Sequence, residues 1–214
     1  MTLIKTLINS RYVIWFLLAL PAWEYVHELF YPTRHYPEMM EDSGELSIQI
    51  LVFTLCITPL TLVFKYFTAG KSIARWLLKS RRYFGIAGFG YAAVHTILYI
   101  RQTFDLELIW LEALDWPLGT GWISMLILLP LALTSNKWSI QKMGTTWKWM
   151  QRLSYIAIIA GFAHWLLLDF FIDNALAWII PLIGAKLVHL GYRVWQRQKE
   201  FLNQRRIDVE VSHK

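Results

Sequence analysis

The sequence predicts an all-α membrane protein: a polytopic bundle of six transmembrane helices with both termini in the cytoplasm. Three observations predict this fold class. They are the composition, the number of long apolar segments, and the alternating charge of the segments between them. Of the 214 residues, 56% are hydrophobic and 17% are charged, and 12 Trp, 12 Phe and 10 Tyr are present. This composition is typical of a membrane protein and not of a soluble domain.

Six apolar segments follow one another along a single domain, residues 1–214. Each is close to the roughly 20 residues with which a helix crosses about 30 Å of hydrocarbon. The predicted spans are residues 12–31, 47–67, 83–100, 118–135, 149–168 and 175–195. The basic tail that follows, residues 197–214, is predicted to be disordered and cytoplasmic.

The connections between the apolar segments alternate in charge. Basic residues occupy the second and fourth connections and the tail, and these are Lys65, Lys71, Arg75, Lys79, Arg81, Arg82, Lys137, Lys142, Lys148, Arg152, Arg193, Arg197, Lys199, Arg205 and Arg206. Acidic residues occupy the other three connections: Glu38, Glu41, Asp42, Glu45, Asp105, Glu107, Glu112, Asp115, Asp169 and Asp173. The positive-inside rule then puts the acidic connections outside. Since the basic residues form no continuous face, no nucleic acid partner is expected.

Two apolar segments carry a histidine in their interior, His95 in the third and His164 in the fifth. Small residues precede each histidine by seven and three positions, namely Gly88 and Ala92, and Ala157 and Gly161. At helical spacing these offsets put each small pair on the same face as its histidine. A flat ligand could lie between the two helices with one imidazole on each side, as haem does when its iron takes two axial ligands. The alternative is that the histidines link helices by hydrogen bonds, with the small residues marking helix contacts.

Helix length places the two histidines at one depth. His95 lies thirteen residues after Arg82 and His164 twelve after Arg152, which is about 20 Å and about 18 Å of helix. Both imidazoles are therefore expected about two-thirds of the way toward the outer face. Two histidines with unrelated packing roles would have no reason to agree in depth, so this favours a shared haem with His95 and His164 as its axial iron ligands.

The rest of the sequence limits the kind of cofactor. Cys56 is the single cysteine and no Cys-x-x-Cys-His motif occurs, so a haem would be bound non-covalently, as haem b. No glycine-rich dinucleotide motif and no sizeable soluble domain is present. Electrons would therefore come from a separate donor and pass to a separate acceptor.

A second haem would need ligands about thirteen residues before each outer histidine. Those positions hold Arg81 or Arg82 and Gln151, and neither a guanidinium nor a carboxamide is a good ligand for haem iron. One haem per chain is therefore predicted. His189 could ligate an inner cofactor from the sixth segment, although a packing role is the stronger interpretation. With one outer haem, a quinol that enters the membrane or a bound flavin is the expected immediate donor.

Several motifs fall in a familiar order along the chain. They are Arg81, Arg82, Gly85, His95, Tyr99, Leu133, Thr134, Ser135, Met143, Gly144, Trp147, Tyr155 and His164, with Ile-Thr-Pro-Leu at residues 57–60. From about Gly44 to His164 the sequence resembles the ferric-reductase-like transmembrane superfamily, and within it the MsrQ (YedZ) branch. Where that branch has a histidine at the start of the fifth span, this chain has Gln151.

The resemblance implies a bacterial inner-membrane protein whose haem ligands are His95 and His164. It also implies an electron-transfer subunit, not a catalytic one, that takes electrons from the quinone pool or a cytosolic flavin reductase. The implied acceptor is a periplasmic molybdopterin-containing methionine sulfoxide reductase, MsrP, which repairs oxidised proteins. FMN as a further cofactor stays open. Two alternatives also stay open: a stand-alone ferric or quinone reductase, and a non-redox transporter or membrane anchor.

Overall fold

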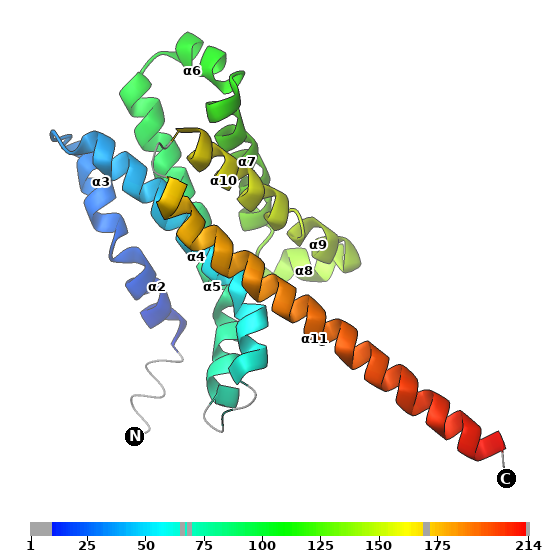
Figure 1. Ribbon diagram of the computed structural model, residues 1–214. Helices are drawn as coiled ribbons and strands as arrows, with labels where there is room; N and C mark the ends of the chain where they lie inside the picture. Colours follow the sequence, from blue (N-terminus) through cyan, green and yellow to red (C-terminus); the bar gives the residue numbers. More distant parts are fainter. Residues whose placement is uncertain (1–9, 65–66, 68–69, 169–171, 213–214) are drawn as a thin grey trace.

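The computed structural model describes residues 10–64, 67, 70–168 and 172–212, with the side chains of the last helix described as far as Arg206. All the regular secondary structure in this part of the chain is helical (Figure 1). The helices are α2 (Arg11–Ala19), α3 (Ala22–Phe30), α4 (Tyr36–Phe64), α5 (Gly70–Thr103), α6 (Leu106–Ala113), α7 (Trp116–Leu133), α8 (Lys137–Met143), α9 (Thr145–Gln151), α10 (Ser154–Leu168) and α11 (Ile172–Ser212).

The helices are those of a multi-pass membrane protein. Five helical stretches in the described residues are long and apolar enough to cross a membrane, and the pair α2 and α3 adds a sixth if it counts as one span. That pair bends by 49°. Pro21 lies at the bend, where its ring and missing N–H interrupt a continuous helix. The expected first span, 12–31, is thus two short helices.

Four of the helices form a central bundle. α4 packs mainly against α5, and α10 packs mainly against α7, so that α5 and α10 lie diagonally opposite each other. Two serine hydroxyls join the packed pairs at buried positions: Ser47 donates to the Gly88 carbonyl and Ser124 to the Ala157 carbonyl, both at 2.8 Å. The apolar core around these contacts comprises Leu51, Val52, Leu55, Leu128, Ala157, Ile158 and Phe162.

α11 lies across α4 and then runs well beyond the other helices (Figure 1). Lys186 links it to the bundle through two hydrogen bonds: its ammonium donates to the Leu55 carbonyl at 2.9 Å and to the Tyr155 hydroxyl at 3.2 Å. Pro59 lies four residues after Leu55 inside α4. Because proline has no N–H, it leaves the Leu55 carbonyl without its usual helical donor, and Lys186 takes that place.

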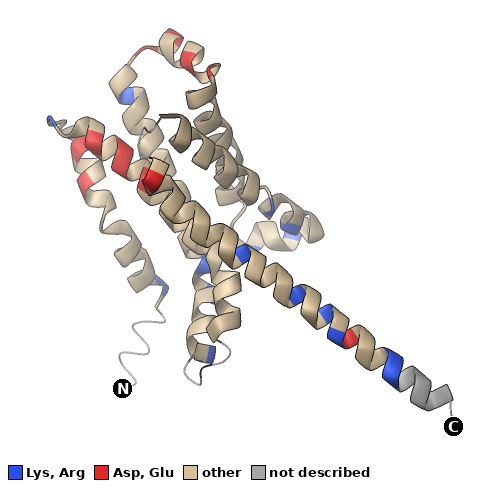
Figure 2. Cartoon of the chain, viewed as in Figure 1, with Lys and Arg blue, Asp and Glu red and all other residues tan. Residues whose placement is uncertain are grey.

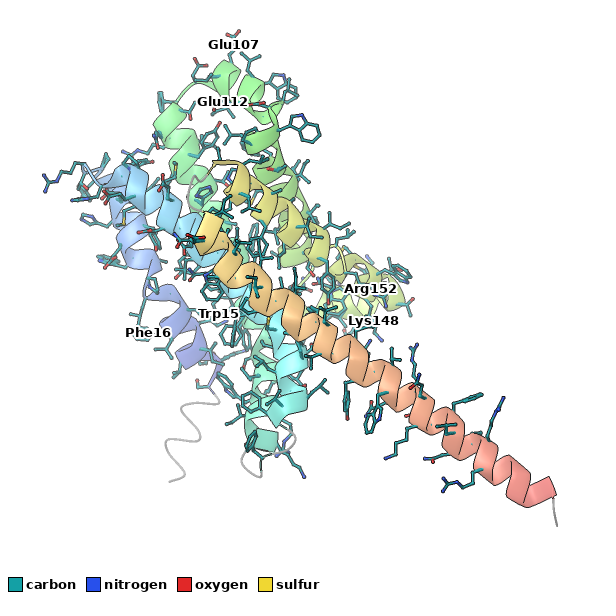
Figure 3. The ribbon with its side chains drawn as sticks, in the orientation of Figure 1. Trp15, Phe16, Glu107, Glu112, Lys148 and Arg152 are labelled. Carbon is teal, nitrogen blue, oxygen red and sulfur yellow. The ribbon has the colours of Figure 1, made fainter. Side chains whose placement is uncertain are left out.

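On the other side of the bundle, α2 packs one aromatic face against α5. The Trp15 and Tyr83 rings meet edge to face, with centroids 5.7 Å apart. The neighbouring Phe16 is 65% exposed and points away from the bundle (Figure 3). An exposed aromatic side chain on a membrane helix is ordinary where the solvent is lipid.

The helices extend further than the predicted spans. α4 begins at Tyr36 instead of residue 47, and α5 begins at Gly70 instead of residue 83. The physical reason is that Glu, Lys and Arg form helices readily, although their charge excludes them from an apolar window. The connecting segments predicted as loops are therefore largely helical. Lys65 and Asp169 lie outside the described residues.

The tail also differs from its prediction. Residues 197–212 continue α11 as helix and are not disordered in the structure. Pairs of side chains one turn apart support this stretch: Lys199 lies over the Trp195 ring at 5.5 Å, and Arg205 over the Phe201 ring at 4.8 Å. Such pairs at i and i+4 stabilise an exposed helix, and the stretch has no glycine or proline to end it. Residues 213 and 214 lie outside the described residues.

Charge divides the molecule along its length. Figure 2 shows most of the acidic residues at the end formed by α3, α6 and the start of α4, and most basic residues toward the other end and along α11. Arg34 and Arg101 are exceptions at the acidic end. This separation has the form that the alternating loop charges predict, and the cytoplasmic location of both termini stays a prediction.

Candidate cofactor site

The two predicted histidines meet inside the four-helix bundle. His95 comes from α5 and His164 from α10, and their ring centroids are 6.1 Å apart with the planes at 78°. Both side chains are half-buried. The structure thus brings together two imidazoles that are 69 positions apart in the sequence, from helices that hardly touch each other.

Each imidazole is held by the backbone of the neighbouring helix. The His95 Nδ1 atom lies 2.7 Å from the Met40 carbonyl oxygen of α4, and the His164 Nδ1 atom lies 2.7 Å from the Pro117 carbonyl oxygen of α7. A carbonyl oxygen only accepts, so both Nδ1 atoms must carry the proton and donate. In a neutral imidazole this leaves the lone pair on Nε2, the nitrogen free to bind a metal.

The spacing of the rings fits a metal bound between them. A metal–imidazole bond is about 2.0 Å long and the ring centre lies about 1 Å beyond the nitrogen, so two rings on opposite sides of one ion have centres roughly 6 Å apart. The observed 6.1 Å agrees. No group of three or more His, Cys, Asp or Glu side chains in the described residues could hold a metal ion. The pair therefore suits an iron whose other ligands come from a macrocycle.

A glycine of the neighbouring helix lies against each imidazole. A Cβ atom added at Gly44 would be 2.8 Å from the His95 Nδ1 atom, and one added at Gly121 would be 2.8 Å from the His164 Nδ1 atom. Real Cβ atoms essentially never approach so closely. Any larger residue at these positions would push the ring away from its carbonyl partner.

The small residues predicted to line a cofactor lie mostly at contacts between helices. A Cβ atom at Gly88 would be 2.7 Å from Leu51 of α4, and one at Gly161 would be 3.4 Å from the Ser124 hydroxyl of α7. Ala157 is fully buried in the core and Ala92 packs at its edge. The face that these residues share is the contact with α4 and α7, and their contact with a cofactor stays a prediction.

The family model described as the ferric reductase like transmembrane component matches residues 43–162. The Brucella ovis protein named "Protein-methionine-sulfoxide reductase heme-binding subunit MsrQ" is 32% identical over 167 residues, which cover 76% of this chain and 69% of that protein. The chain belongs to the ferric-reductase-like transmembrane family, in its MsrQ branch. Proteins of the same name from Brucella canis and Brucella suis match to the same extent. No solved structure matches.

The stretch matched by the ferric-reductase-like family model corresponds to the central bundle. It begins at Ser43, early in α4, and ends at Phe162, two residues before His164. It therefore contains the whole of α5 and α7 and most of α4 and α10. The helices α2, α3 and α11 lie outside it, and they pack around the bundle that carries the two histidines.

In this MsrQ-branch chain, the positions where a second haem would need its ligands hold side chains that form hydrogen bonds with other residues. The Gln151 amide donates to the Leu131 carbonyl at 3.2 Å, and the Arg81 guanidinium donates to the Thr58 hydroxyl at 3.2 Å. His189 lies on α11, and its Nδ1 atom is buried without a hydrogen-bond partner in the part of the chain that the structure describes. Among the described residues, His189 has no ring contact with another histidine of the kind that joins His95 and His164.

The residues that hold the two imidazoles were not predicted from the sequence. Met40 and Pro117 act through backbone carbonyls, which carry no sequence signature of their own. Gly44 and Gly121 do leave a signal: a hydroxyl residue precedes each glycine, and a serine follows three positions later. Comparing the segments before the two histidine helices would have found this repeated spacing.

Proposed function

We propose that this chain binds one haem b between His95 and His164 and passes electrons across the bacterial inner membrane to a periplasmic methionine sulfoxide reductase. When bound, the haem supplies reversible one-electron redox chemistry. The protein's contribution is to hold two imidazoles close together, with their planes at 78° and their Nε2 lone pairs available, inside an apolar bundle.

The matched imidazole pair is the observation that carries this proposal. Two histidines hydrogen-bonded to each other would have one ring donating to the other. Here both Nδ1 protons go to backbone carbonyls on separate helices. That arrangement uses the donor nitrogen of each ring and leaves both acceptor nitrogens for a shared ligand. It therefore supports the haem protein over the non-redox anchor or transporter.

The names of the relatives support the identity of the partner. The Brucella proteins are named as haem-binding subunits of a protein-methionine-sulfoxide reductase. We infer that the acceptor of this chain is the corresponding catalytic subunit, a molybdopterin-containing MsrP-like protein. We further infer that the donor is a membrane quinol or a cytosolic flavin reductase, with FMN as a candidate intermediate cofactor. The lipid bilayer surrounds the bundle.

We expect one haem per chain. Arg81 and Gln151 are poor iron ligands and are already bound to Thr58 and Leu131. Haem extraction against protein quantitation should therefore give a ratio near one, with a reduced b-type absorption spectrum. The ratio should be unchanged in His189→Ala. A ratio near two that falls on this substitution would instead assign a second haem to His189, and haem-free protein from haem-replete membranes would overturn the proposed function.

Within the acidic end of the molecule, α6 and the residues that flank it form the proposed docking surface for the periplasmic partner. Glu107 and Glu112 lie on α6 at one end of α7, whereas Lys148 and Arg152 lie near its other end (Figure 3). The structure shows which acidic groups can be neutralised safely. Glu112 accepts a hydrogen bond from the Tyr99 hydroxyl at 2.5 Å and should be kept.

Neutralising the other acidic residues at this end should slow electron transfer to the partner. Asp105 and Asp115 cap the N-termini of α6 and α7 through their side chains, and asparagine caps a helix as well as aspartate does. The triple variant Asp105→Asn, Glu107→Gln, Asp115→Asn should therefore keep its fold while its association rate falls about 10-fold or more at low salt. Stopped-flow oxidation of the reduced chain by the partner, measured against ionic strength, checks this.

The matched control neutralises acidic groups on another element of the same end. Glu41→Gln and Asp42→Asn remove two charges from α4. The side chains of Glu41 and Asp42 form no hydrogen bond or ion pair among the described residues. If this control slows transfer as much as the triple variant, the effect is one of overall charge and not of docking at α6. A rate and salt dependence that stay unchanged in both would place the docking surface elsewhere.

A further inference from the structure

The two halves of the central bundle repeat one arrangement. In the first half, α4 presents a carbonyl at Met40, a hydroxyl at Ser43, a glycine at Gly44 and a serine at Ser47. In the second half, α7 presents the same four groups at the same offsets: Pro117, Thr120, Gly121 and Ser124. The partner helix of each half supplies a histidine and, seven residues before it, the carbonyl that accepts from the last serine: Gly88 with His95, and Ala157 with His164.

The contacts of the two halves also agree. The Met40 carbonyl accepts from the His95 Nδ1 atom at 2.7 Å and from the Ser43 hydroxyl at 2.7 Å. The Pro117 carbonyl accepts from the His164 Nδ1 atom at 2.7 Å and from the Thr120 hydroxyl at 2.9 Å. One oxygen in each half therefore receives an imidazole N–H and a hydroxyl at the same time. We call each such carbonyl with its hydroxyl residue and glycine a shelf: the α4 shelf is Met40, Ser43 and Gly44, and the α7 shelf is Pro117, Thr120 and Gly121.

We propose that the hydroxyls of Ser43 and Thr120 are positioning groups that set the electron-donating strength of the two imidazoles. This inference rests on the proposed function, because it concerns the same two histidines. Neither hydroxyl is proposed as an iron ligand. Each acts through the carbonyl that it shares with a histidine.

The physical reason is competition for one acceptor. Each of these carbonyls lies in a helix and also has the backbone N–H four residues on as a donor, and every further donor to one oxygen draws electron density away from the imidazole's hydrogen bond. A weaker N–H···O bond leaves the imidazole a weaker electron donor, since the hydrogen bond on Nδ1 raises the basicity of Nε2. A strongly donating imidazole stabilises oxidised iron more than reduced iron. The hydroxyls should therefore keep the midpoint potential higher than it would be without them.

Removing either hydroxyl should shift the midpoint potential in the same direction. Ser43→Ala and Thr120→Val delete the hydroxyl with little change in volume, and both should move the potential to more negative values while the haem content stays that of the wild type. Because the halves repeat each other and the sites are on separate helices, the double variant should shift by about the sum of the two. Spectroelectrochemical titration of the full chain in detergent or nanodiscs measures this.

The chain supplies a matched control one helical turn away. Ser47→Ala and Ser124→Ala also delete a buried hydroxyl that donates to a carbonyl, but those carbonyls, of Gly88 and Ala157, accept from no imidazole among the described residues. These variants should lose thermal stability and leave the potential where it is. Equal potentials in the wild type, the shelf variants and the controls would overturn the inference, as would a shift to more positive values in the shelf variants.

A measurement on haem-free protein separates this inference from the proposed function. With ¹⁵N-labelled histidine, the apo chain should show both imidazoles as the tautomer protonated at Nδ1. Ser43→Ala should change the Nδ1 signal of His95 alone, and Thr120→Val that of His164 alone. If the chain bound no haem, the proposed function would fail, and these signals would still decide the inference: changes confined to the matching histidine support it, and unchanged signals overturn it.

Discussion

His95→Ala and His164→Ala should each abolish the low-spin b-type spectrum. Iron held from one side loses half its axial ligand field and gains an open coordination position, so any haem that remains should be high-spin. Substitutions of groups that merely support a metal ligand cost about 10- to 100-fold in affinity, and loss of the ligand itself should cost more than about 100-fold. Haem content and the absorption spectrum of the purified variants measure both effects.

The two histidines should behave alike, because each is held by an equivalent shelf. His189→Ala is the matched control, since it removes an imidazole from the same membrane domain whose Nδ1 atom has no hydrogen-bond partner among the described residues. Normal haem content and an unchanged low-spin spectrum in both His95→Ala and His164→Ala would refute the ligand assignment.

Gly44→Ala and Gly121→Ala should each lower haem occupancy severely, although neither glycine is a ligand. The added methyl group would lie 2.8 Å from an imidazole nitrogen, so either the ring or the helix must move. Overpacking of this kind costs about 1–3 kcal/mol, which is about 5- to 150-fold in occupancy of the correct ring position. The ring displacement also breaks the hydrogen bond to Met40 or Pro117, and the tautomer is then no longer fixed.

Gly90→Ala is the control for the two shelf glycines. Gly90 lies within α5 on the same helix as His95, and a Cβ atom there would meet nothing within 4 Å. Since alanine is favoured over glycine in a helix interior by up to about 1 kcal/mol, this variant should keep its haem and be at least as stable as the wild type. Thermal unfolding and haem content of the three variants, measured side by side, test the assignment. Equal haem content in all three would show that the imidazoles have more room than the structure gives them.

The sequence predicted the membrane helices well and their ends poorly, for one physical reason. An apolar window detects the part of a helix that lies in lipid, whereas the helix itself continues for as long as its residues favour helical backbone. Lys71 to Arg82 and the acidic start of α4 are helical without being apolar. The 34 residues of α5 therefore include nearly all of a segment that charge alone marked as a connection.

The histidine pair was predictable, and its surroundings were not. Equal helix length from a basic boundary gave the two imidazoles a common depth, and the structure brings them to 6.1 Å. Offsets of three and seven residues, however, define only a face about 60° wide at 3.6 residues per turn, and one helix face can contact both a cofactor and a neighbouring helix. Gly88 and Gly161 lie on the part of that face that packs against α4 and α7. The glycines next to the rings come from α4 and α7, and no offset within α5 or α10 points to them.

The repeated shelves have a consequence for how a cell makes this protein. Ribosomes make the chain from its N-terminus, so α4 and α5 are made before α7 and α10, and the carbonyl partner of His95, Met40, belongs to this first hairpin. The second hairpin, from α7 to α10, arrives later and brings His164 on its own shelf. Neither hairpin alone contains both of the proposed haem ligands. Haem loading therefore belongs after insertion of about four-fifths of the chain, and a truncated product lacks the pair that would retain the cofactor. We therefore expect retention of haem to require the complete bundle.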